Sequence, residues 1–233
     1  MWRRLLLLGA ALTAISCSKD AVRVEFYTVD GYTFSDADKQ TIRSIANDTA
    51  LEVRRLLPGL PELLCLKVRP GADVIPETGE SASAFPPDTI YWTVDPKRAT
   101  ETIRAQLRPT LFHELHHLVR DAKVPRDTIL DAAISEGMAT VFERDYAGAA
   151  APWGQYPPEV SAWAQELRAL PPSAPRQEWL FRHPDGRRWI GFKVGTYLVE
   201  RARSSLGQPL PALIYASSEA VARAGTSTIA GPP

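Results

Sequence analysis

The chain has 233 residues, of which 45% are apolar, and this is enough for one good-sized domain. Lysine plus arginine and aspartate plus glutamate both number 27, so the formal net charge is zero. A nucleic-acid-binding protein normally carries a basic excess or a basic stripe. The sequence shows neither, and we expect no nucleic-acid partner.

The N-terminal residues have the pattern of an export signal. Two arginines in Met1–Arg4 precede the apolar stretch Leu5–Ile15, which is too short to cross a bilayer as a mature helix. Ala14-Ile15-Ser16-Cys17 then resembles a bacterial lipobox, in which the cysteine becomes the lipidated first residue. An ordinary signal peptide cleaved nearby is the alternative. Both predict an exported protein, and the lipobox places it in the bacterial cell envelope, with a lipid anchor at Cys17 as its membrane contact.

The first half of the chain shows three strand signals and one clear helix signal. Segments 21–29, 63–68 and 89–94 are rich in β-branched, aromatic and leucine residues and predict strands. Between the first two, Ser35 is expected to cap a helix that runs to about Leu57. Residues 69–87 contain four prolines and predict a loop. The chain has two cysteines, and if Cys17 carries lipid, Cys65 in the second strand has no partner, so no disulfide framework is expected.

A long helical pattern follows the third strand. Pro109 lies inside it, so we expect one helix from about Ala99 and a second that starts near Pro109. The apolar residues recur at spacings of four and three: Ile103, Leu107, Leu111, Leu115 and Leu118.

The remainder of the chain predicts mostly helix. Asp127 is expected to cap a helix that ends near Tyr146, and a loop is expected at 147–158. Further helices are predicted at 159–170, 188–203 and within 210–224. Strands followed by helices, without regular alternation, predict an α+β fold. We expect one domain over residues 18–225 and a disordered tail over 226–233.

Three of the four histidines lie within five residues, in the motif His113-Glu114-Leu115-His116-His117. On a helix, residues four apart lie on one face, so the imidazoles of His113 and His117 can bind one zinc ion. Glu114 is rotated by about 100° from His113, where its carboxylate can act as general base on a water molecule at the metal. The histidine face lies opposite the leucine stripe, which favours a metal site over a buried histidine pair.

Two histidines need a third protein ligand. The extended motif HExxHxxGxxH is absent, because Arg120 and Lys123 occupy its last two defined positions. Glu136, on the next predicted helix and among small residues, is the expected third ligand. Glu143 lies two turns further on the same face, as a substitute ligand or as a hydrogen-bond acceptor for one.

Three segments together resemble a bacterial family of predicted zinc-dependent proteases. They are HELHHLVR, SEGMATVFE and GFKVGTYLV, and the resemblance covers roughly Asp88 to Arg203. Met138 and Phe192 stand where the family usually has leucine and tyrosine. The resemblance implies a zincin-like, gluzincin-type metallopeptidase, with a small N-terminal sheet packed on a mainly helical C-terminal part and the HExxH helix at the centre. It also implies Zn²⁺ on His113, His117 and Glu136, with Glu114 as base.

Four further features have weaker signals. Tyr197 is a candidate catalytic donor to the oxyanion that forms during hydrolysis, and a packed aromatic ring is the alternative. His183 is a candidate donor in a turn, and a surface histidine is the alternative. His116 is expected to pack or to bond a nearby polar group. By analogy with zincins, the 89–94 strand is expected to border the cleft.

The predicted function is peptide-bond hydrolysis by a zinc-activated water, with a peptide or protein as the substrate. The alternatives are hydrolysis of a non-peptide amide, and a non-catalytic envelope protein that keeps the metal for binding or assembly. An intact Glu114 favours an enzyme, because structural zinc sites usually fill all four positions with cysteine or histidine.

Overall fold

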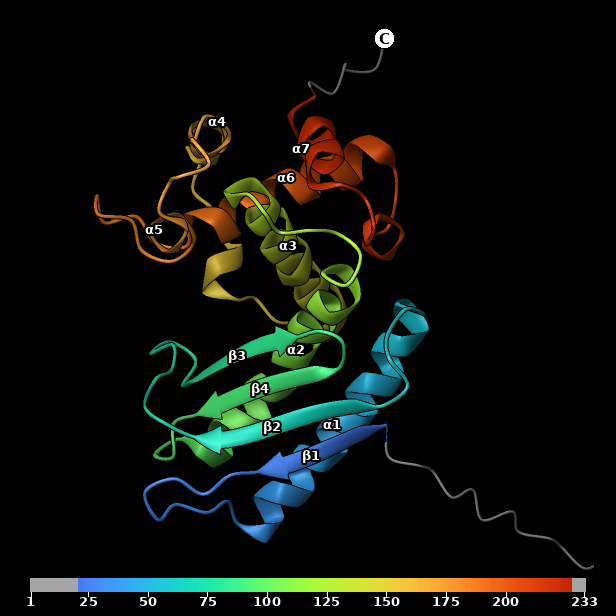
Figure 1. The fold of residues 1–233 in the computed structure, drawn as a ribbon, viewed down its shortest axis with the longest axis vertical. Helices are drawn as coiled ribbons and strands as arrows, with labels where there is room; N and C mark the ends of the chain where they lie inside the picture. The colour runs from blue at the N-terminus through green and yellow to red at the C-terminus, as the bar shows by residue number, and fades with distance from the viewer. Residues whose placement is uncertain (1–20, 228–233) are drawn as a thin grey trace, which may run out of the picture.

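The computed structural model describes residues 21–227, which form an α+β fold dominated by helix (Figure 1). The expected signal peptide, Cys17 and residues 228–233 of the expected tail lie outside the described residues. Within residues 21–227, no helix is both long enough and apolar enough to cross a membrane.

The described residues contain four strands and seven α-helices. The strands are β1 (Val22–Phe26), β2 (Leu64–Pro70), β3 (Glu80–Phe85) and β4 (Thr89–Val94). The α-helices are α1 (Asp36–Leu56), α2 (Ala99–Arg120), α3 (Ile129–Phe142), α4 (Val160–Arg168), α5 (Arg176–Leu180), α6 (Ile190–Leu206) and α7 (Ser218–Thr226). Short 3₁₀ turns occupy Pro152–Gly154 and Leu210–Leu213, and a π-helical turn spans Glu143–Ala147.

The strands form one sheet in the order β1-β2-β4-β3. β1, β2 and β4 are parallel, and β3 pairs antiparallel with β4 at the edge nearest the helical half (Figure 1). α1 makes the crossover between the parallel strands β1 and β2. α1 and α2 cover one face of the sheet (Figure 1), so α2 lies between the sheet and the C-terminal helices. One hydrophobic core runs from Val22 to Ala222 through both halves.

The prediction of a loop over 69–87 is wrong in its second half, where β3 forms. Its sequence, ESASAF, has small and polar residues with little strand propensity, although serine and alanine alternate with the strand period of two. β3 is stabilised by its pairing with β4 over six residue pairs, from Glu80–Val94 to Phe85–Thr89. A partner strand, and not local preference, therefore determines this element.

The prediction of a helix break at Pro109 is also wrong, because α2 is continuous from Ala99 to Arg120. A proline inside a helix removes one hydrogen bond and crowds the preceding turn, at a cost of about 3 kcal/mol. Ile103, Leu107 and Leu111 are all buried and follow one another at intervals of four residues. An unbroken helix keeps this stripe on one face across Pro109, and its burial offsets the cost of the proline.

The third long helix begins one residue later and ends earlier than predicted. Thr128, and not Asp127, is the N-cap, because its side chain and that of Asp131 form a capping box. α3 ends at Phe142 and widens into the π-helical turn, instead of continuing to Tyr146. α5 was not predicted, and α7 extends to Thr226, one residue into the expected tail.

α3 and α6 touch through their backbones at two glycines. A Cβ atom added to Gly137 would lie 2.1 Å from the carbonyl carbon of Gly195, and one added to Gly195 would lie 1.7 Å from the carbonyl oxygen of Ala133. No real side chain fits at such distances. The contact holds α3 in place one residue after Glu136.

We expect Gly195→Ala to separate α3 from α6 and to destabilise the protein by about 2 kcal/mol, since the clash exceeds the gain in helix propensity. The displacement of Glu136 should also weaken zinc binding. Chemical denaturation and zinc titration measure the two effects. Ser204→Ala, at an exposed position of α6, is the matched control. Unchanged stability of Gly195→Ala would contradict the close contact.

Candidate metal centre

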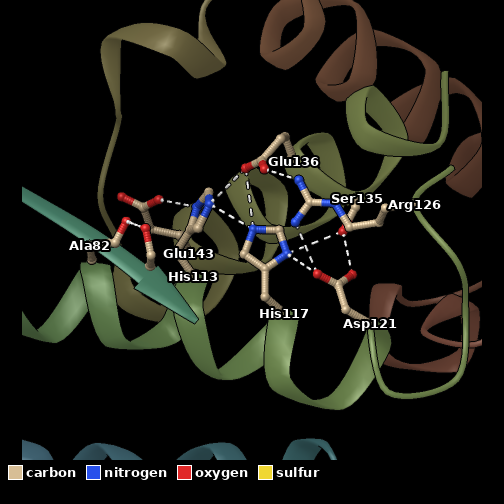
Figure 2. A network of polar contacts seen from close by, with 9 residues as sticks. Ala82, His113, His117, Asp121, Arg126, Ser135, Glu136 and Glu143 are labelled. Carbon is tan, nitrogen blue, oxygen red and sulfur yellow. Dashed lines mark hydrogen bonds and ion pairs between the residues drawn. The ribbon is translucent and has the colours of Figure 1, made fainter. Parts of the chain in front are cut away.

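Three side chains from two helices converge on one point. His113 and His117 come from α2 and Glu136 comes from α3 (Figure 2). The Nε2 atoms of the two histidines lie 3.2 Å apart, and each lies 3.2 Å from Oε2 of Glu136. All three residues are buried. The structure thus brings together the three residues that the sequence predicts as metal ligands.

The triangle of ligand atoms fits a zinc ion. Ligands at 2.0–2.1 Å from a tetrahedral zinc lie about 3.3 Å from one another. The three observed separations of 3.2 Å agree with this value. Two imidazoles and one carboxylate are a donor set found in catalytic zinc sites, where the fourth position holds water or substrate.

Each histidine is held by a second contact at its other ring nitrogen. Nδ1 of His113 lies 3.2 Å from Oε2 of Glu143, the first residue of the π-helical turn. Nδ1 of His117 lies 3.1 Å from Oγ of Ser135 and 3.5 Å from Oδ2 of Asp121. Such contacts at the outer nitrogen orient the ring of a metal-binding histidine and select its tautomer.

A half-buried arginine, Arg126, joins the two helices beside the triangle (Figure 2). Arg126 donates to Oδ2 of Asp121 at 2.9 Å and to Oε1 of Glu136, the oxygen that the histidines do not contact. Ser135 donates to Oδ1 of Asp121 at 2.9 Å. Arg126 therefore fixes the orientation of Glu136 and leaves Oε2 free for the metal.

Charges within the cluster shift its pKa values in opposite directions. Burial lowers the pKa of His113, but contacts with Glu136 and Glu143 outweigh burial and raise that pKa to about 10. Burial raises the pKa of Glu136, but His117, His113 and Arg126 together hold it well below its ordinary value. Glu136 is therefore an ionised ligand at neutral pH. The proton on His113 leaves when a metal binds, because imidazole coordinates in its neutral form.

Glu114 and the metal triangle line a cavity of about 730 Å³. The pKa of Glu114 is raised, chiefly by burial. The charges of His113 and His117 and a backbone hydrogen bond from Ala84 of β3 act in the opposite direction but are outweighed. One wall of the cavity is β3, and the other contains aromatic residues of the C-terminal half. A carboxylate with a raised pKa, beside a metal site and open to a cavity, is a candidate general base.

The other candidate residues lie outside this cluster. Tyr197 does not line the cavity. Its ring centroid lies 5.5 Å from that of Tyr156 and 5.6 Å from the guanidinium carbon of Arg201. His183 pairs with Asp185 at 2.9 Å in a turn, also away from the cavity. His116 is fully buried against Phe142, neither ring nitrogen has a partner, and burial lowers its pKa, so it is a neutral packed side chain.

Sequence reasoning missed several residues of the site. Asp121 follows His117 by four residues and so shares its helix face, a spacing that could have indicated it. Arg126 lies in an irregular segment and has no comparable signal. Glu80 was missed together with β3. Its carboxylate accepts hydrogen bonds from Trp92 and Thr110, and burial raises its pKa to about 7.

The chain belongs to the family described as "Predicted Zn-dependent protease (DUF2268)", whose model matches residues 37–223. Zinc is thus the metal that the family description and the cluster both indicate. No curated protein and no solved structure matches the chain.

We expect Asp121→Asn to weaken zinc binding by about 10- to 100-fold, because it removes the negative charge that orients His117 and Arg126. Competition against a chromogenic zinc chelator measures the affinity. Asp127→Asn, at an exposed position of the same connection, is the matched control. Equal affinity of the two variants would contradict the orienting role of Asp121.

We expect Glu80 to make stability depend on pH. Because its folded pKa is about 7 against an ordinary 4.5, its protonated form favours folding, and this contribution is lost as pH rises through 7. From pH 5 to pH 8, wild type should lose on the order of 3 kcal/mol relative to Glu80→Gln. Urea denaturation at each pH measures this, with exposed Glu101→Gln as control. Parallel curves for wild type and Glu80→Gln would refute the expectation.

Proposed function

We propose that this protein is a zinc metallopeptidase with a zincin-like, gluzincin-type site. His113, His117 and Glu136 hold the ion, and Glu114 is the general base. The observation that carries the proposal is the 3.2 Å triangle of ligand atoms next to a buried carboxylate that opens on a cavity.

The chemistry divides between the ion and the chain. Bound zinc supplies a Lewis acid that polarises a carbonyl and lowers the pKa of water. Glu114 accepts the proton of the attacking water and passes it to the leaving amine. Its raised pKa suits both steps, since a base with a pKa nearer neutrality accepts a proton and releases it again. Tyr197 lies away from the cavity, and we do not include it in this mechanism.

β3 offers its backbone to an extended peptide. The carbonyl of Gly79 accepts from Asp95 next to β4, whereas the carbonyl of Glu80 accepts from Ile75 on the opposite side. Alternation along the strand then directs the peptide groups of Ala82 and Ala84 away from β4 and toward the cavity. The backbone N–H of Ala84 bonds to Glu114, and a peptide can pair as an added strand with the N–H of Ala82 and the carbonyl groups of Ala82 and Ala84. The cleft-bordering strand is thus β3, and not the 89–94 strand, which β3 separates from the cavity.

We further propose that the protein is exported and anchored in the bacterial cell envelope through lipid on Cys17. The support is the charged start, the short apolar stretch and the lipobox-like Ala14–Cys17. β1 begins at Val22, so an anchor at Cys17 would lie a few residues from the folded part. The substrate in this setting is a peptide or protein of the envelope.

We expect Glu114→Gln to keep about one zinc per chain and to lose peptidase activity by about 100-fold or more, because it removes the base and keeps the ligands. His117→Ala should lose both. Elemental analysis and digestion of a peptide library measure the two properties, with exposed Glu101→Gln as control.

These outcomes separate the alternatives. Zinc without turnover of any peptide by wild type would contradict the peptidase and favour a binding or assembly protein. Turnover of small amides alone would assign a different hydrolase. Wild type without zinc would contradict the metal centre.

A further inference from the structure

Four aromatic side chains form one wall of the metal cavity, and we call them the aromatic wall: Trp153, Phe181, Trp189 and Phe192. They come from a 3₁₀ turn, the residue after α5, the N-cap of α6 and the first turn of α6. Their ring centroids lie 5.4 to 6.3 Å apart in five pairs. Segments from separate parts of the chain therefore assemble one apolar surface.

The aromatic wall begins at the metal ligand itself. The ring of Phe192 stacks on that of His113, with centroids 6.4 Å apart and planes 23° apart. A side chain that touches Phe192 from the cavity therefore lies next to the metal triangle. In a peptide that binds across the metal, that position is adjacent to the bond being hydrolysed.

Trp189 adopts an unusual backbone conformation. Its φ of 59° and ψ of 34° lie in the left-handed region, which a bulky residue enters only at a free-energy cost of about 1 to 2 kcal/mol. Strained residues of this kind cluster at ligand-binding positions. Trp189 precedes α6 directly and lines the cavity, so the strained conformation places its ring in the wall.

An ion pair links the loop before β3 to the residue before Trp189. Arg188 donates to Glu77 at 2.6 Å, and its guanidinium lies 5.4 Å from the centroid of the Trp189 ring. Ile75, two residues before Glu77, packs on the aromatic cluster. The loop before β3 is thus tied to the start of α6, and a side chain that enters beside Phe192 meets an apolar surface that includes Ile75.

We propose that the aromatic wall is a specificity subsite that selects peptides with a large apolar or aromatic side chain next to the scissile bond. This inference rests on the proposed function. Acidic side chains are disfavoured there, because Glu80, Glu114 and Glu143 line the same cavity. In the opposite wall, residues 81–84 of β3 are serine and alanine and offer backbone contacts, so we assign selectivity at this position to the aromatic wall.

The first test uses internally quenched peptides that differ at one position next to the cleaved bond. Phenylalanine, tryptophan or leucine should exceed glycine, lysine and aspartate in kcat/KM by on the order of 30-fold or more. Trp189→Gly, which tolerates the positive φ, should reduce this preference to a few-fold. Trp163→Ala, which removes an aromatic side chain outside the cavity, should retain the preference for large apolar residues. Cleavage without any preference in wild type would overturn the subsite and leave the peptidase intact.

The second test needs no turnover and no variant. Acetohydroxamate and the hydroxamate of N-acetylphenylalanine both chelate zinc, and only the second carries a benzyl group. Wild type loaded with zinc should bind the benzyl compound about 30-fold more tightly, with quenching of tryptophan fluorescence. Equal affinities would overturn the subsite. Tight binding of the benzyl compound together with failure to cleave any peptide would support the subsite and contradict the peptidase.

Discussion

The structure depends on the meeting of one carboxylate and two imidazoles, all buried, at one point between two helices. Glu136 belongs to α3 and the histidines to α2, so neither helix contains the site alone. Burial of a polar group costs free energy unless the group finds a hydrogen-bond partner. Glu143, Ser135, Asp121 and Arg126 supply those partners. The geometry of the site therefore depends on these four partners as well as on the three ligands.

The two halves of the fold contribute different parts of this arrangement. The sheet packs on α2 and brings the edge strand β3 to the cavity, while α6 presses α3 into position through Gly195 and Gly137. α2 connects the two halves, because its stripe of buried leucines packs in the core and its histidines His113 and His117 contact Glu136 of α3. The long helix thus carries both the packing surface and the chemistry.

Local patterns predicted the parts of the site that lie on one helix. The spacing of His113 and His117, the apolar stripe of α2 and the choice of Glu136 needed only helical geometry and the neighbouring sequence. β3 could not be predicted in this way, because its residues have little strand preference and pair only where β4 is already placed. Arg126 and Trp189 lie in irregular segments, and their proximity to the metal triangle results from tertiary packing. The helix break expected at Pro109 does not form, because burial of the apolar stripe along the whole of α2 outweighs the local cost of the proline.

The two cavity walls, β3 and the aromatic wall, place different constraints on how the sequence of this protein can change in evolution. A strand that is recognised through its peptide groups tolerates changes of side chain, because every residue except proline presents the same N–H and C=O. In the proposed peptidase, β3 could therefore vary in sequence and still pair with an extended chain. The four side chains of the aromatic wall have no such freedom, because each substitution there changes the shape of the cavity beside the metal triangle. New preferences within this family should arise through substitutions around α6, at residues that neither bind the ion nor stabilise the sheet.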